Sequence, residues 1–180
     1  MHLKNKKDNS LKDKTSLLNK YKKLLQILKD MGSVVLAYSG GVDSAFLLKA
    51  IKDSGIRHLA VTAFSETMAE KELSSAETMA SILDANFRII KTCEMDNQNF
   101  KKNPKDRCFY CKDELFSKLT EIARSEGFHF VVDGSNLDDI SDWRPGRKAA
   151  EKHGVKSPLI EAELCKTEIR ELSRHKELHT

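Results

Sequence analysis

Apolar residues change their spacing twice near the start of the chain. Leucines recur at helical intervals over residues 17–28 with lysines between them, which predicts an amphipathic helix lying on a sheet. A continuous apolar run over residues 34–37 then predicts a strand, and an amphipathic helix is expected from Ser44 to about Asp53, ended by Gly55. The strand and the second helix are joined by a turn with two adjacent glycines, Ser39-Gly40-Gly41-Val42-Asp43-Ser44.

The same alternation continues along the rest of the chain. Further strands are expected at residues 58–62, 86–90 and 128–132, with a short edge strand, interrupted by Pro158, at residues 155–160. Further helices are expected over residues 68–83 and 109–125. A short helix is expected after Pro145-Gly146 to about residue 153, and a last helix after a cap at Thr167. Alternating strands and helices predict an α/β fold, with a parallel sheet of about five strands and helices on both faces.

The positive charge is concentrated at the start of the chain. The net charge is +4, and residues 1–30 hold nine lysines and three aspartates. Such a basic arm can attract RNA, but the solvated face of a helix explains it without a partner, so we do not expect nucleic acid binding. We expect residues 1–10 to be disordered. We divide the chain into a basic arm and helix, residues 1–30, and one nucleotide-binding domain, residues 31–180.

Composition indicates the cellular compartment in which the protein is expected. No apolar run approaches the roughly 20 residues of a membrane span, and no signal sequence is recognised at the start. Without a signal, the four cysteines are expected to be reduced thiols: Cys93, Cys108, Cys111 and Cys165. The sequence therefore predicts a cytoplasmic protein that does not contact a membrane.

The two-glycine turn has the features of a phosphate-binding site. Its glycines let backbone N–H groups approach a ligand, and the following helix adds free N–H groups and the positive end of its dipole. It is neither a Walker A loop nor a Rossmann fingerprint, and no lysine lies within it. We expect Ser39 and Ser44 to donate to phosphate, and Asp43 to hold the loop or Mg²⁺. The alternative is an ordinary glycine turn.

Two later segments carry further candidate chemistry. Cys108 and Cys111 have the spacing of a metal or cluster edge, although one C-x-x-C supplies only two ligands. The second segment follows the buried strand at residues 128–132 and combines carboxylates, which suit Mg²⁺, with arginines, which suit phosphate or carboxylate. A solvated acidic loop is the alternative there. Because ligands bind beyond the carboxyl ends of parallel strands, we expect this segment to meet the two-glycine turn.

Six motifs occur in one order: SGGVDS, NPKDRCFYCK, DGSNLDD, D-x-R-P-G-R, SPL and K-x-E-I-R. The first matches all six positions of the SGGxDS loop of the N-type ATP pyrophosphatases. Together, over residues 30–172, they resemble the ATP-dependent sacrificial sulfur transferases of nickel-pincer nucleotide cofactor synthesis (LarE family, ExsB-like). The resemblance implies an adenine nucleotide alpha hydrolase-like PP-loop domain. In that family ATP adenylylates a carboxylate of a pyridinium dicarboxylate mononucleotide and releases pyrophosphate, after which sulfur is delivered.

The resemblance and the residue chemistry together define the expected sites. For ATP they are Ala37, Ser39, Gly40, Gly41, Val42, Asp43, Ser44, Thr62, Ala63, Ser65, Gly134 and Asn136. For Mg²⁺ they are Asp43, Asp138 and Asp139. For the substrate they are Arg107, Tyr110, Lys112, Asp142, Arg144 and Arg147. The catalytic residues are expected to be Asp43, Ser44, Cys108 and Cys111.

The end of the chain departs from the family. The family continues into a region with a donor cysteine and arginine-rich substrate contacts, which residues 174–180 do not resemble. We therefore expect a chain that lacks this region and forms a homo-oligomer or is completed by another chain. An iron–sulfur cluster, used by some members, is not supported within this chain. The alternatives are a truncated nucleotide-binding module, a tRNA thiolase, or an amidotransferase domain like that of NAD or GMP synthetase.

Overall fold

Four parallel strands form a single sheet. The computed structural model describes residues 2–64, 70–92, 107–140, 145–176 and 178, with side chains except at 2–14, 70–72, 107 and 145. The sheet order is β3-β2-β1-β4, and each neighbouring pair is parallel. The strands are β1 (Ser33–Ala37), β2 (Arg57–Phe64), β3 (Phe87–Lys91) and β4 (Phe130–Asp133).

The expected edge strand at residues 155–160 is wrong. Lys156 makes an isolated parallel bridge with Val132 of β4, and the chain then enters helix α7 (Pro158–Glu161). Pro158 explains the difference, because it has no N–H for a ladder and suits the first position of a helix. The described sheet therefore has four strands and one bridge, where about five strands were expected.

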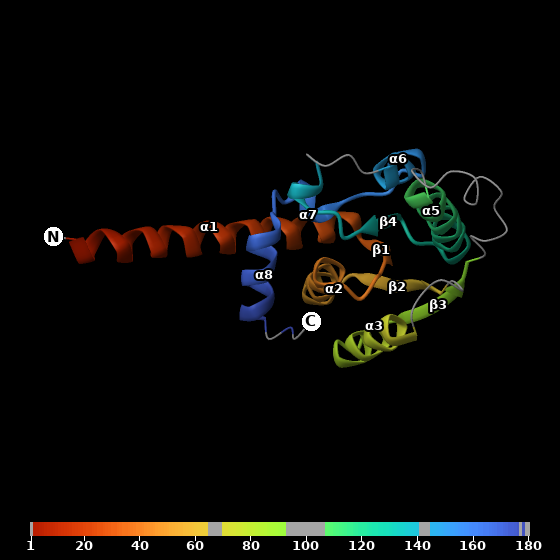
Figure 1. Cartoon of the computed structure of the whole chain (residues 1–180), viewed down its shortest axis with the longest axis horizontal. Helices are drawn as coiled ribbons and strands as arrows, with labels where there is room; N and C mark the ends of the chain where they lie inside the picture. The colour runs from red at the N-terminus through yellow and green to blue at the C-terminus, as the bar shows by residue number, and fades with distance from the viewer. Residues whose placement is uncertain (1, 65–69, 93–106, 141–144, 177, 179–180) are drawn as a thin grey trace.

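Helices cover both faces of the sheet (Figure 1). Alternate residues of β1 separate the two cores: Val34 and Leu36 pack in one cluster and Val35 in the other. The first cluster contains residues of α1, α2, α3 and α8, and the second contains residues of α5 and α6. Besides α7, the described helices are α1 (His2–Met31), α2 (Val42–Ser54), α3 (Glu70–Ile82), α5 (Arg107–Glu126), the 3₁₀ turn η2 (Leu137–Ile140), α6 (Pro145–Lys152) and α8 (Lys166–His175).

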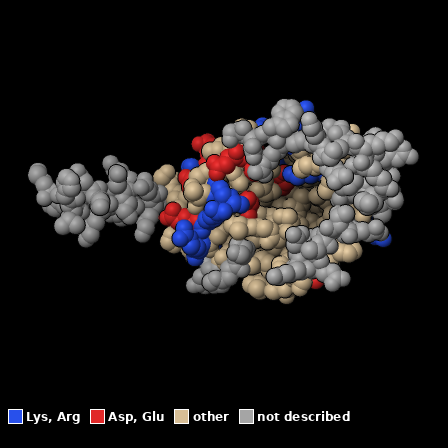
Figure 2. Space-filling view, in the orientation of Figure 1, with Lys and Arg blue, Asp and Glu red and all other residues tan. Residues whose placement is uncertain are grey.

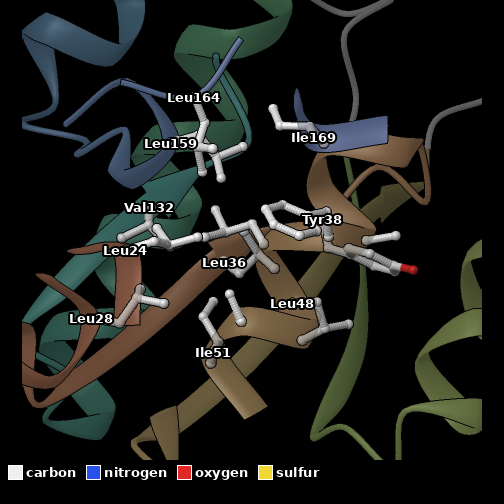
Figure 3. Packing of buried hydrophobic residues seen from close by; sticks show 14 of the residues in the cluster. Leu24, Leu28, Leu36, Tyr38, Leu48, Ile51, Val132, Leu159, Leu164 and Ile169 are labelled. Atoms are coloured by element: carbon white, nitrogen blue, oxygen red, sulfur yellow. The ribbon is translucent and has the colours of Figure 1, made fainter. Parts of the chain in front are cut away.

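The first core joins segments that lie far apart in the sequence. Figure 3 shows Leu24 and Leu28 of α1 on one side of Leu36, with Leu159 and Ile169 from the last third of the chain nearby. All five side chains are fully buried. The end of the chain therefore packs on the same sheet face as its beginning.

Helix α1 is one continuous element from His2 to Met31. The expected disordered arm at residues 1–10 is therefore wrong, and Figure 1 shows this helix extending well beyond the body of the protein. Residues 2–31 contain no glycine or proline, so no strong helix breaker interrupts it. Gly32 follows it with a φ of 71°, the left-handed conformation that often ends helices. No helix in the described ranges is long and apolar enough to cross a membrane.

The two-glycine turn packs tightly against α3. Gly40 has a φ of 74°, and a Cβ atom there would lie 2.9 Å from Ala76 Cβ and 3.0 Å from Ala76 Cα. Gly55, after α2, has the same φ, but a Cβ atom there would meet nothing within 4 Å. Conformation alone therefore favours glycine at residue 55, whereas residue 40 also lacks room for a side chain.

The burial of α1 predicts that its second half cannot be separated from the domain. Replacing Leu24, which is 0% exposed, with alanine should lower the free energy of unfolding by about 2–5 kcal/mol. Leu18→Ala, on the same helix at 51% exposure, should change it by no more than about 0.5 kcal/mol. Urea unfolding measures both. A small effect of Leu24→Ala would show that residues 1–30 fold apart from the sheet.

The two glycines form a matched pair for a second test. Gly55→Ala should cost about 1–2 kcal/mol of unfolding free energy, because alanine is strained at positive φ. Gly40→Ala should cost about 1–3 kcal/mol more, because its Cβ also overpacks the contact with α3. Equal losses in urea unfolding would mean that α3 moves away at no cost and that the close approach does not constrain the turn.

Candidate functional site

The two-glycine turn lies where the sheet reverses its winding. Strand β1 is central, with β2 on one side and β4 on the other. The chain therefore leaves β1 in one direction and later returns to its opposite side. Ligands of open parallel sheets bind at such a switch point, beyond the carboxyl ends of the strands. The turn after β1 and the turn after β4 meet there, as the sequence predicted.

Two serine hydroxyls fold the turn onto the start of α2. Ser44 Oγ donates to Gly41 O at 3.0 Å and lies 3.1 Å from Ser39 Oγ. Gly41 N donates weakly to Ser39 Oγ at 3.4 Å. Gly41 is also the N-cap of α2, and having no side chain it leaves the first amides of the helix open to a ligand. Free amides and hydroxyls at a helix N-terminus are the groups that commonly bind anions, so the turn is a candidate anion site.

The turn after β4 touches this loop directly. A Cβ atom at Gly134 would lie 3.0 Å from Ser44 N and 3.1 Å from Ser44 Cα. Contacts this short leave little room for any side chain at residue 134. Gly134 therefore serves as the packing contact between the two turns, and the expected approach of the DGSNLDD segment to the loop is confirmed.

Asp43 is the electrostatic centre of the site. Its Oδ2 accepts hydrogen bonds from Lys166 Nζ, at the start of α8, and from Asn136 Nδ2 at 3.3 Å. Its Oδ1 is buried and has no hydrogen-bond partner within the described part of the chain. One carboxylate oxygen is thus engaged, while the other is buried without a partner among the described residues.

Lys166 is a candidate functional residue that sequence reasoning did not assign. The loop contains no lysine, but α8 brings one to it from 123 residues further along the chain. The K-x-E-I-R motif contains this lysine, so the signal was present without an assigned role. The last helix also begins differently from the prediction. Its N-cap is Cys165, not Thr167, and Cys165 N donates to Glu168 Oε2 at 3.0 Å.

The start of α8 is fixed by carboxylates. Asp138 Oδ2 accepts a hydrogen bond from Lys166 N at 2.9 Å. Glu168 Oε1 accepts a hydrogen bond from Lys20 Nζ of α1 at 2.7 Å. Burial acts to raise the pKa of Glu168, but the hydrogen bonds from Lys20 and Cys165 outweigh it and hold that pKa below its ordinary value. Charges on three segments therefore set the position of Lys166.

The three aspartates expected to bind Mg²⁺ belong to one hydrogen-bond network. Asp139 Oδ2 accepts from Asn136 N at 2.9 Å, and Asn136 in turn donates to Asp43. Within the described residues no group of three or more candidate ligands forms a metal cluster. Asp138 and Asp139 hold backbone amides, so Asp43 Oδ1 is the carboxylate oxygen that best fits an added cation. The three-aspartate set stays a prediction.

Two of the residues expected to bind ATP, Ala37 and Thr62, lie near the ends of β1 and β2. Thr62 is buried, and its hydroxyl donates to Tyr38 O at 2.7 Å, which ties β2 to the start of the loop. Burial raises the pKa of the Tyr38 phenol to about 12. Ala37 is paired with Val61 of β2. The Thr62 hydroxyl thus has a structural role, while Ser65 lies outside the described residues.

The expected substrate residues on α5 lie against α6. A Cβ atom at Gly146 would be 2.5 Å from Lys112 Cδ and 3.1 Å from Cys108 Sγ, so these two side chains pack where α6 begins. Tyr110 packs edge-on to Phe109, with ring centroids 5.4 Å apart. Cys108 is exposed and Cys111 partly buried. Several expected residues or their side chains lie outside the description: Cys93, residues 103–106, the Arg107 side chain, Asp142 and Arg144.

Comparison with curated proteins identifies relatives. No protein-family model matches the chain. It is 38% identical over 159 residues to an uncharacterized protein of Synechocystis sp., covering 88% of this chain and 59% of that protein. It is 35% identical over 161 residues to pyridinium-3,5-bisthiocarboxylic acid mononucleotide synthase of Lactiplantibacillus plantarum, covering 88% and 58%. The chain therefore spans less than two thirds of the length of these relatives.

Solved structures share the fold. The NH3-dependent NAD synthetase of Campylobacter jejuni aligns with a TM-score of 0.71 and 17% identity, covering 91% of this chain and 74% of that one. The U34-tRNA thiolase of Methanococcus maripaludis aligns with a TM-score of 0.69 and 16% identity, covering 92% and 65%. The chain is a homologue of pyridinium-3,5-bisthiocarboxylic acid mononucleotide synthase and shares the fold of these NAD synthetase and tRNA thiolase structures.

Proposed function

We propose that the chain binds ATP at residues 39–44 and adenylylates a carboxylate of a pyridinium dicarboxylate mononucleotide with release of pyrophosphate. This step would prepare sulfur transfer in the biosynthesis of the nickel-pincer nucleotide cofactor. The observation that carries the proposal is the loop itself: a glycine turn at the switch point of the sheet, with Lys166 held at its aspartate. The substrate class comes from the Lactiplantibacillus plantarum relative, a pyridinium-3,5-bisthiocarboxylic acid mononucleotide synthase.

The proposed reaction assigns a task to each group of the loop. A carboxylate oxygen of the acceptor attacks the α-phosphorus of ATP, and the bond from that phosphorus to the bridging oxygen of the β-phosphate breaks. Pyrophosphate departs with the electron pair of that bond. The amides at the start of α2 and the hydroxyls of Ser39 and Ser44 would bind its oxygens, and Lys166 would offset its charge.

Magnesium fits this proposal at one protein oxygen. Asp43 Oδ1 is buried and has no partner among the described residues, and Mg²⁺ in nucleotide sites commonly takes one or two carboxylates together with phosphate oxygens and water. Asp43 would hold the ion, which would supply charge neutralisation to the phosphates. Its second oxygen would meanwhile keep Lys166 in place.

Sulfur transfer is the second stage of the proposal. Cys108 or Cys111 would attack the acyl adenylate and expel AMP to form a thioester. Removal of the cysteine α-proton would then break the Cβ–Sγ bond, leaving a thiocarboxylate and a dehydroalanine. Both thiols lie in the first turns of α5, where the helix N-terminus favours a thiolate. The cytoplasmic location and the assembly into a homo-oligomer or with another chain stay predictions.

The role of Lys166 can be tested by pyrophosphate release. With ATP, Mg²⁺ and the mononucleotide, Lys166→Met should release pyrophosphate about 100-fold more slowly, since one charge-assisted contact of about 2–3 kcal/mol is lost. Arg170→Met is the matched control, because Arg170 is exposed one turn further along α8. Pyrophosphate release that does not depend on the mononucleotide would contradict the substrate assignment. Equal rates for both variants would contradict the role of Lys166.

The sulfur step predicts a change in the mass of the protein. After turnover, intact-protein mass spectrometry should show a fraction of chains lighter by one H2S, and peptide mapping should place dehydroalanine at Cys108 or Cys111. Cys165→Ser, at the N-cap of α8, is the control and should still form the lighter species. An unchanged mass in the presence of pyrophosphate release would exclude this chain's cysteines as sulfur donors.

A further inference from the structure

A cavity of about 230 Å³ opens between α5, α6 and α7. Six charged residues line it, three basic and three acidic: Lys112, Arg147 and Lys156, with Asp139, Glu151 and Glu161. Ala150, Val155 and Ile160 add an apolar part to the wall. The space is smaller than the roughly 300–1,000 Å³ of sites for whole drug-sized ligands, so it suits one substituted ring or one end of a longer molecule.

A buried carboxylate holds two serines of the cavity wall in place. Asp133, which ends β4, is 5% exposed. It accepts hydrogen bonds from Ser135 Oγ and Ser157 Oγ, each at 2.7 Å, and both serines line the cavity. A buried charge held by two hydroxyls orders the segments that carry it. The wall is therefore organised by the end of strand β4 and does not depend on surface loops alone.

The cavity and the two-glycine turn share one segment. Gly134 lies against Ser44 of the loop, while the next residue, Ser135, lines the cavity. Asp139 also lines it and binds the amide of Asn136, whose side chain reaches Asp43. The segment 134–139 thus borders both the phosphate loop and the cavity. A ligand in the cavity would lie next to the nucleotide.

Cationic and anionic side chains lie next to one another in the wall of the cavity. Arg147 Nε lies 3.3 Å from Glu151 Oε1, one turn along α6. Lys112 crosses the start of α6 because Gly146 has no side chain to block it. Charges of both signs around an apolar wall disfavour a simple anion. They match a flat ligand that carries carboxylate or phosphate groups and a positive ring. Figure 2 shows basic and acidic side chains lying next to one another on the face in view.

We propose that this cavity is the acceptor site, and that it binds a pyridinium carboxylate through Lys112, Arg147 and Lys156. The basic side chains bind the negative groups, and the carboxylates of Asp139 and Glu151 face the cationic ring. The site rests on the proposed function for the identity of its ligand. It adds Lys156 and Ser157, which the sequence motifs did not assign to substrate.

Calorimetry of the 180-residue chain with pyridinium-3,5-dicarboxylic acid mononucleotide tests the site. Titrations are made without nucleotide and with an ATP analogue whose α–β bridge is a methylene group, so that no adenylylation follows. Arg147→Ala and Lys156→Ala should each bind about tenfold more weakly, because each removes a charge-assisted contact. Lys148→Ala, on α6 next to Arg147 but not lining the cavity, should bind as the unchanged chain does. Urea unfolding checks that each variant is folded.

The outcomes separate this site from the proposed function. If the unchanged chain does not bind the mononucleotide under either condition, or if Arg147→Ala and Lys156→Ala bind it as tightly as Lys148→Ala does, the cavity is not the acceptor site. This holds whether or not pyrophosphate is released. If binding is weakened as expected but the mononucleotide does not stimulate pyrophosphate release, the site stands and the adenylylation proposal fails.

Discussion

The contact between Gly134 and Ser44 constrains the whole site. The two residues belong to turns that follow adjacent parallel strands, and their backbones approach closely enough to leave little room for a side chain. The approach sets the height of the β4 turn above the loop. Asn136 and Asp139 then reach Asp43 through one hydrogen-bond relay. A bulkier residue at 134 would separate the two turns and lengthen each of these contacts together.

The site brings its positive charge from a remote helix. A glycine turn without a lysine binds phosphate only through amides and hydroxyls, which carry partial charges. Here α8 supplies Lys166, and the position of α8 depends on ion pairs with α1, among them Lys20 with Glu168. Lys20 and Lys23 of the basic N-terminal segment have carboxylate partners, Glu168 and Glu163. Each exposed pair contributes little alone, so the packed leucines of α1 provide most of the anchoring.

Local patterns predicted most of the fold. The strand–glycine–helix order around residues 39–44, the continuous apolar run that forms β4, and Gly55 and Gly127 as helix stops follow from spacing and backbone conformation. Two failures come from single local residues that outweigh the pattern, and a third is a contact between residues far apart in the sequence. Residues 155–160 have strand-like composition, but Pro158 starts α7. Thr167 suits an N-cap, yet Glu168 binds the amide of Cys165 and α8 begins earlier. Nothing local in the sequence shows that Lys166 reaches Asp43, because 123 residues separate them.

The two turns would hold the two proposed ligands at fixed positions relative to each other. The nucleotide loop is rigid because Gly40 packs on α3 and the two serines bind each other. The cavity wall is ordered because Asp133 holds Ser135 and Ser157. Both depend on the same short segment after β4, so a shift of that segment would move both binding surfaces together. Fixed relative placement is what an attack by a carboxylate on the α-phosphorus requires, since the loss of translational freedom is met when each ligand binds. The rigidity of one backbone turn is therefore the physical basis on which a two-substrate reaction could proceed here.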